Sequence, residues 1–163
     1  MEELTMLGSP VGELLKKHGH TIAVAESSAG GMISASLLAV PGASKYFLGG
    51  GVIYTHEARR VFLALPDTAL AGIRASTEDY ALKLATQVRE QYNTTWGLSE
   101  TGATGPTGNA YGDAAGHACF ALVGPVRETL TLETGSNDRE ANMWAFTKAA
   151  LELLRRAISD ATI

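Results

Sequence analysis

Cysteine is scarce in this 163-residue sequence, and long apolar runs and an excess of positive charge are missing from it. The one cysteine, Cys119, excludes an internal disulfide framework and is typical of a reducing compartment, so we expect a cytoplasmic protein. No apolar run is long enough to cross a bilayer, and no basic segment followed by an apolar one marks a secretory signal at the start. The sequence therefore predicts no contact with a membrane.

Positive charge is scarce, since 13 lysines and arginines stand against 17 acidic residues for a net charge of −4. This balance gives no electrostatic case for nucleic acid, because binding to a phosphate backbone depends on a basic surface. With 45% apolar and 18% charged residues, the chain is too hydrophobic to be disordered, and its length suits one domain over residues 1–163. Glycine is in excess, at 18 residues, so its positions are the first functional clue.

Apolar periodicity and turn residues predict strands and helices in alternation. Ser9 followed by Pro10 indicates the start of the first helix. Strands are expected at residues 21–25, 52–54, 94–98, 116–123 and 126–134, the last two as an antiparallel pair. Helices are expected at residues 9–19, 30–40 and 56–65, after 76 or 77, and after 137 or 138. This order predicts an α/β fold with three αβα layers and a mixed, mostly parallel sheet, in which ligands bind beyond the carboxyl ends of strands.

The turn after the first strand carries a carboxylate, two hydroxyls and two glycines: Glu26, Ser27, Ser28, Ala29, Gly30 and Gly31. At a helix N-terminus these groups meet unpaired backbone N–H groups and the positive end of the helix dipole. Because Gly30 and Gly31 lack Cβ, a ligand can approach the backbone closely. The turn therefore fits a phosphate site, a serine nucleophile beside an oxyanion hole, or an ordinary N-cap serine followed by flexible glycines.

A second glycine-rich segment, residues 101–112, follows the strand that contains Trp96. Its candidate site residues are Thr101, Gly102, Thr104 and Gly105. Its backbone can form an anion nest, or the segment is a plain surface loop; the Gly-Lys-Ser/Thr ending of a P-loop is absent. Arg139 opens the last helix, where a cation opposes the dipole, which indicates a substrate phosphate or a salt bridge with Asp138 or Glu140. The histidines lack ligand spacing, so no metal is expected.

Residues 25–31 resemble the A-E-S-C-T-G-G signature of the CinA C-terminal family, the nicotinamide mononucleotide deamidases. Residues 101–108, T-G-A-T-G-P-T-G, are similar to the T-G-I-A-G-P-x-G loop of the same family. Further similar segments, in the same order and at the same spacing, lie at residues 40–44, 47–54 and 138–141. The ordered set covers nearly the whole chain, which makes the resemblance specific.

The resemblance implies hydrolysis of the carboxamide of nicotinamide mononucleotide to nicotinate mononucleotide and ammonia, a reaction of pyridine nucleotide salvage in NAD metabolism. It implies that Ser27 is the nucleophile, with a lysine as its base and Tyr54 in the position of an assisting tyrosine. We expect backbone N–H groups of residues 28–31 to stabilise the oxyanion, and residues 101–108 with Arg139 to hold the nucleotide. The expected partner is a small pyridine nucleotide, no cofactor is expected, and apolar helix faces favour a homo-oligomer.

The sequence departs from the family where the lysine should stand, because Arg59 occupies that position. Arginine stays charged at neutral pH and cannot act as a base, although it can hold a phosphate or an oxyanion. Three interpretations remain open. His56, one turn before Arg59, is the base; or Ser28, which replaces the family's cysteine, or Tyr54 takes part in the proton transfer; or catalysis is lost and a nucleotide-binding or regulatory module remains.

Overall fold

A computed structural model describes residues 2–161, which form one sheet with helices on both faces. The strands are β1 (Ile22–Glu26), β2 (Phe47–Val52), β3 (Trp96–Ala103), β4 (His117–Val123) and β5 (Arg127–Glu133). The helices are α1 (Glu2–His18), α2 (Met32–Leu38), α3 (His56–Leu63), α4 (Glu78–Tyr92) and α5 (Arg139–Ala161), with short 3-10 turns η1 (Ala43–Lys45) and η2 (Asp67–Leu70). Among these residues, no helix combines the length and apolar character needed to span a membrane.

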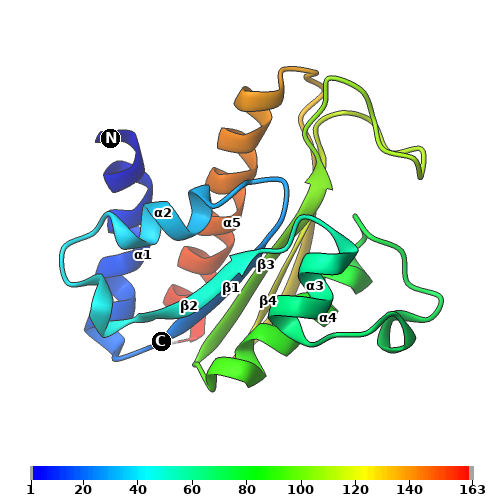
Figure 1. Ribbon diagram of the computed structural model, residues 1–163. Coiled ribbons are helices and arrows are strands. Elements are labelled where there is room, and N and C mark those ends of the chain that lie inside the picture. Colours follow the sequence, from blue (N-terminus) through cyan, green and yellow to red (C-terminus); the bar gives the residue numbers. More distant parts are fainter. Residues whose placement is uncertain (1, 162–163) are drawn as a thin grey trace.

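The strands lie in the order β2-β1-β3-β4-β5, and this order decides where a site can form. β1 pairs in parallel with β2 and β3, whereas β3, β4 and β5 pair antiparallel. Two of the four pairings are therefore parallel, and the predicted mixed sheet of an αβα fold is confirmed. Because β1, β2 and β3 run in one direction, the segments that follow them meet at one edge of the sheet (Figure 1).

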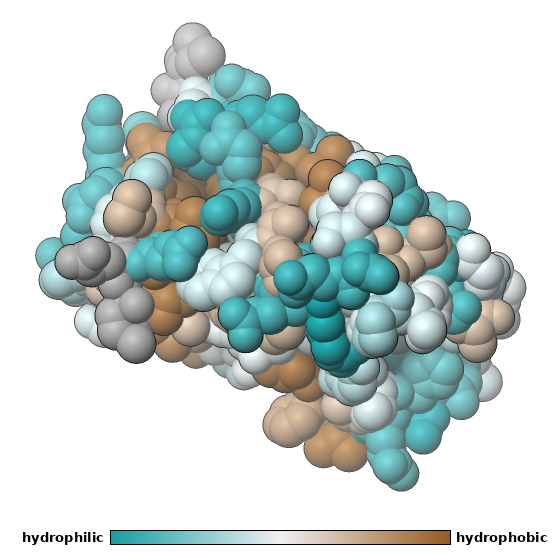
Figure 2. Space-filling model, turned by 90° about the horizontal axis from the view of Figure 1, so that it is seen from above, coloured by the Kyte–Doolittle hydropathy of each residue, from teal (hydrophilic) through white to brown (hydrophobic). Residues whose placement is uncertain are grey.

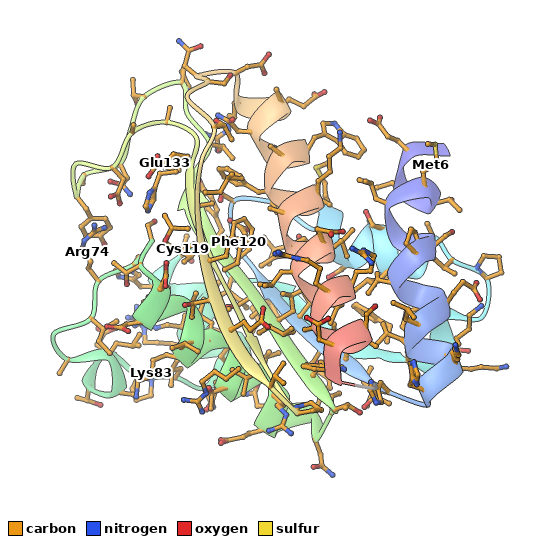
Figure 3. All side chains as sticks on the ribbon, turned by 180° about the vertical axis from the view of Figure 1, so that it is seen from behind. Met6, Arg74, Lys83, Cys119, Phe120 and Glu133 are labelled. Atoms are coloured by element: carbon orange, nitrogen blue, oxygen red, sulfur yellow. The ribbon has the colours of Figure 1, made fainter. Side chains whose placement is uncertain are left out.

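Each face of the sheet buries its own apolar core under a layer of helices (Figure 1). On one side α1, α2 and α5 cover Trp96 and Phe120, and the Phe120 ring meets Phe146 of α5 edge-on at 6.3 Å. On the other side α4 packs its buried stripe, which includes Leu84, against the sheet. Cys119 and Phe120, neighbours in β4, point to these opposite faces (Figure 3). Strand alternation thus separates two environments along every strand.

The first helix begins earlier than its local signals predict. α1 starts at Glu2 and contains Pro10, so the prediction of a start at Ser9 is wrong. Proline removes one backbone N–H from the helix ladder, which favours a first-turn position when only local terms count. Here Leu7, one turn before Pro10, packs against the larger core. Tertiary packing of this first part of α1 outweighs the local penalty.

Candidate functional site

The turn between β1 and α2 lies at the carboxyl edge of the parallel strands and is organised by a buried carboxylate. The N-cap residue, Gly31, has a left-handed backbone (φ 99°) and no side chain to cap the helix. Glu26 at the end of β1 supplies the acceptor instead. Its oxygens accept from the N–H groups of Gly31 (2.9 Å), Ile33 (3.0 Å) and Ser34 (2.9 Å), and from Ser34 Oγ (2.7 Å). Glu26 is thus the cap of α2.

A second buried carboxylate, Glu100 of β3, holds the other half of the turn. Its Oε1 accepts from the N–H groups of Ser27 (3.0 Å) and Ala29 (2.8 Å), and its Oε2 accepts from the Ser28 hydroxyl. Burial raises the pKa of Glu100, and the nearby charge of Glu26 adds to this, while the three donors act in the opposite direction. Sequence reasoning missed Glu100, although a carboxylate within a buried strand was a signal that could have found it.

The two carboxylates leave one amide of the predicted oxyanion hole available. Ala29 N–H donates to Glu100, Gly30 N–H to the Ser27 carbonyl (3.0 Å), and Gly31 N–H to Glu26. Ser28 N–H donates to no acceptor within residues 2–161, and the Ser27 hydroxyl likewise makes no hydrogen bond with that part of the chain. Ser27 is half-buried. The turn therefore combines a free hydroxyl with a free N–H on neighbouring residues.

Arg139 connects the start of α5 to two other segments of the same edge. Its Nη1 donates to the Gly105 carbonyl (2.5 Å) and its Nη2 to the Tyr54 hydroxyl (3.2 Å), just beyond the end of β2. Asn142, one turn further along α5, is buried and donates to the Thr104 carbonyl (2.9 Å). Three predicted site residues, Tyr54, Gly105 and Arg139, thus come together although they lie far apart in the sequence.

An open cavity of about 690 Å³ adjoins this turn. It is lined by residues of α1, α2 and α5 and of the turn itself: Leu4, Gly30, Gly31, Met32, Ala35, Arg139, Glu140, Met143 and Trp144. Figure 2 looks down on this end of the molecule, where apolar side chains lie between polar ones. Arg139 makes no ion pair among the described residues, so the salt bridge considered for it is absent there. Its charge is available at the wall of the cavity.

Arg59 and His56 of α3 line a cavity with residues of η2 and α4. The Arg59 side chain is buried, and its Nε donates to the Leu65 carbonyl (3.1 Å), its Nη1 to the Tyr80 hydroxyl (3.4 Å) and its Nη2 to Asp67. His56 is exposed and lines, with Arg59, a separate cavity of about 240 Å³. Within residues 2–161 neither side chain bonds to the β1–α2 turn. Their catalytic roles stay predictions.

Thr101 and Gly102 belong to β3 and not to the loop predicted for them, because pairing with β4 continues to Ala103. The Thr101 hydroxyl oxygen accepts from Ser76 N–H (3.2 Å). Since side chains alternate along a strand, Thr101 lies on the sheet face opposite Glu100. The glycine-rich loop at the carboxyl edge therefore begins at residue 104.

Histidine, cysteine and acidic side chains do not gather into a metal site among residues 2–161. The nearest arrangement surrounds His117 of β4, whose Nδ1 bonds to Glu133 and whose Nε2 lies 2.8 Å from the Ser76 carbonyl oxygen. Cys119 Sγ lies 3.7 Å from the same Nε2, and burial raises the pKa of this thiol. The cluster ties β4 to β5 and to the segment before α4 (Figure 3 labels Cys119 and Glu133).

Comparison with known proteins places this architecture in one family. The family model described as the CinA C-terminal domain matches residues 5–158. A CinA-like protein of Myxococcus xanthus is 38% identical over 147 residues, 88% of this chain and 34% of that protein. One of Gloeobacter violaceus is 36% identical over 155 residues, 93% of this chain and 36% of that protein. The chain thus spans about a third of the length of these relatives.

Solved structures agree with the sequence matches. A CinA superfamily protein from Klebsiella pneumoniae superimposes with a TM-score of 0.89 at 25% identity, covering 96% of this chain and 98% of that one. A CinA superfamily protein from Escherichia coli gives a TM-score of 0.86 at 26% identity, with 94% and 90% covered. The match to the family model over nearly all described residues, together with relatives above 30% identity, shows that this chain belongs to the CinA C-terminal domain family.

Proposed function

We propose that this protein is a nicotinamide-nucleotide amidohydrolase, which hydrolyses the carboxamide of nicotinamide mononucleotide to nicotinate mononucleotide and ammonia. One observation carries the proposal: the Ser27 hydroxyl and the Ser28 N–H, neither of which has a partner within residues 2–161, lie side by side at the carboxyl edge of three parallel strands. A nucleophile and an oxyanion donor are the two groups that acyl transfer needs within one turn. Family membership and the resemblance of residues 25–31 to the family signature support it.

The reaction would proceed through an acyl-enzyme. Ser27 Oγ attacks the carboxamide carbon and loses its proton to a base, and Ser28 N–H donates to the resulting oxyanion. Collapse of this intermediate expels ammonia, which takes up that proton, and water then hydrolyses the ester to release the carboxylate. Arg139 and the loop at residues 104–108 would bind the nucleotide phosphate, because a cation and the backbone amides of a glycine-rich loop favour an anion.

The base is the part of the proposal that departs most from the family. Arginine cannot act as a base at neutral pH, and the three donor nitrogens of Arg59 bond to Leu65, Tyr80 and Asp67. His56, on the same helix, is exposed, and Tyr54 bonds to Arg139. We propose His56 or Tyr54 as the proton acceptor. Replacing His56 with alanine should lower kcat if His56 is the acceptor, and full activity of that variant would leave Tyr54 as the proton acceptor.

Ammonia release from nicotinamide mononucleotide tests the function directly. Wild type should release ammonia, and Ser27→Ala should lower kcat by about 10³-fold or more, as loss of a nucleophile does in serine hydrolases. Ser44→Ala is the matched control, since Ser44 is exposed on η1 and should leave kcat unchanged. Equal kcat values for wild type and Ser27→Ala would refute the assignment of the nucleophile.

The guanidinium of Arg59 is bonded to the Leu65 carbonyl and to Asp67, which favours a second candidate, a nucleotide-binding module without turnover. Such a module would keep the cavity and Arg139 but lack a base. Titration calorimetry separates the two candidates, because a module binds nicotinamide mononucleotide without releasing ammonia. Turnover that Ser27→Ala abolishes would exclude the module.

A further inference from the structure

Glu100 is the side chain of the site that no sequence motif indicates. It lies in the second half of β3, fully buried, and reaches across to β1–α2 residues more than 70 positions earlier in the chain. Its hydroxyl partner, Ser28, stands where the family signature has cysteine. A hydroxyl is a far better donor to a carboxylate than a thiol is. The Ser28–Glu100 pair is thus a feature of this chain that the resemblance does not supply.

The contacts of Glu100 lie next to the two groups that the proposed function uses, the Ser27 hydroxyl and the Ser28 N–H. Its Oε1 accepts from the N–H of Ser27 on one side and of Ala29 on the other, and the Ser28 N–H between them has no acceptor in the described part of the chain. Two charge-assisted bonds from one oxygen fix the backbone across three residues. Glu26, the facing charged group from β1, is itself saturated by α2 and cannot take over these donors.

We infer that Glu100 is a positioning residue, whose ionised carboxylate holds the backbone of Ser27 and Ala29 so that the Ser27 hydroxyl and the Ser28 N–H act together on the substrate. This inference rests on the proposed function for its catalytic consequence. The positioning itself is a property of the folded chain and can be measured without turnover. Protonation would reverse the Ser28 pair, because the acid must then donate and the hydroxyl accept.

Two variants separate charge from shape. Glu100→Gln keeps the size and one acceptor but removes the charge, and kcat should fall about 10²-fold with a smaller change in KM, as misplacement of reacting groups by about 1 Å does. Ser28→Ala keeps both amide bonds but removes a donor that lowers the pKa of Glu100. The acid limb of its kcat–pH profile should therefore move to higher pH, whereas Glu100→Gln should lose that limb.

The matched control is Ser34→Ala, which removes the corresponding hydroxyl–carboxylate bond at Glu26. It should leave the acid limb where wild type has it. A purely structural role of Glu100 would lower stability without moving the pH profile in Ser28→Ala. A Glu100→Gln enzyme with kcat within about threefold of wild type, or a Ser28→Ala profile that coincides with wild type, would overturn the inference.

Hydrogen–deuterium exchange keeps the inference distinct from the amidase proposal. In Glu100→Gln the amides of Ser27 and Ala29 should exchange about tenfold faster, since neutral acceptors bind N–H groups less tightly than ionised ones. Should wild type release no ammonia, the proposed function fails, and faster exchange would still support the positioning. Unchanged exchange at residues 27–29 would overturn it whatever the activity. If Glu100→Gln does not fold, the Ser28→Ala pH profile, or its nucleotide affinity against pH where turnover is absent, decides the matter.

Discussion

Replacing Glu26 with alanine tests whether one buried carboxylate caps α2. The change leaves three backbone N–H groups and one hydroxyl without their acceptor, at Gly31, Ile33 and Ser34. A buried donor left unsatisfied costs about 1–3 kcal/mol. Ile33 is fully buried, whereas Gly31 and Ser34 are partly exposed and can recruit water. The free energy of unfolding should therefore fall by about 3–5 kcal/mol, a large share of the roughly 5–15 kcal/mol typical of a domain.

Urea unfolding followed by circular dichroism measures this loss, and two milder variants calibrate it. Glu26→Gln keeps one acceptor oxygen but turns an NH₂ group toward the donors of Ser34, so a loss of about 2 kcal/mol is expected. Ser34→Ala removes only the hydroxyl bond and should lose about 1 kcal/mol. The order alanine, glutamine, Ser34→Ala follows from the number of hydrogen bonds to residue 26 that each variant loses.

A Glu26→Ala protein within about 1 kcal/mol of wild type would refute the reasoning. That outcome would mean that the desolvation of the buried carboxylate cancels its hydrogen bonds, as happens for some buried ions. The glutamine variant distinguishes this case, because it keeps the shape without the charge and would then be more stable than wild type.

Three further perturbations have defined outcomes. Burial lowers the pKa of His117, but its bonds to Glu133 and to a backbone carbonyl outweigh this and raise the pKa above 6.5. The stabilisation that protonated His117 gives the fold is complete below about pH 6.5 and is lost as pH rises through the folded-state pKa. In urea unfolding, His117→Gln should therefore lower the free energy of unfolding by about 1 kcal/mol more at about pH 5.5 than at about pH 8.5. Gly50 has φ 151°, and the Cβ of Gly50→Ala would lie 1.9 Å from a carbonyl oxygen of β1, so this variant should lower the free energy of unfolding by about 3 kcal/mol or more. Gly51→Ala makes an ordinary 3.5 Å contact and should change the same quantity by under about 1 kcal/mol. Under the proposed function Arg139→Ala should raise KM for the nucleotide more than it lowers kcat, and an unchanged KM would remove Arg139 from the site.

Local signals predict those elements whose ends are set by their own residues. α4 begins after Thr77, whose hydroxyl accepts from Tyr80 N–H (3.2 Å), as the sequence around residues 76–79 indicates. α1 shows the converse case, because its start before Pro10 depends on packing that no local pattern encodes. The end of β3 depends in the same way on its pairing with β4.

In the candidate site, too, the sequence predicts some residues and not others. Tyr54, Gly105 and Arg139 could be predicted to share a site because each follows a parallel strand or opens a helix at the same edge, and the structure joins them. Glu100 could not be placed there, since its partners lie over 70 residues away. A single carboxylate in a strand forms no motif with the residues near it in the sequence. Nor does helical spacing on α3 predict that Arg59 turns toward η2 and α4.

The pair of carboxylates also bears on which ligand group the β1–α2 turn can accept. A helix N-terminus binds phosphate through its free N–H groups and its positive dipole. Here Glu26 takes the N–H groups of Gly31, Ile33 and Ser34, and Glu100 takes those flanking Ser28. A phosphate would have to displace these acceptors and approach their negative charge. Under the proposed function, the turn therefore suits a neutral carboxamide that becomes an oxyanion only during reaction, and Arg139 suits the phosphate.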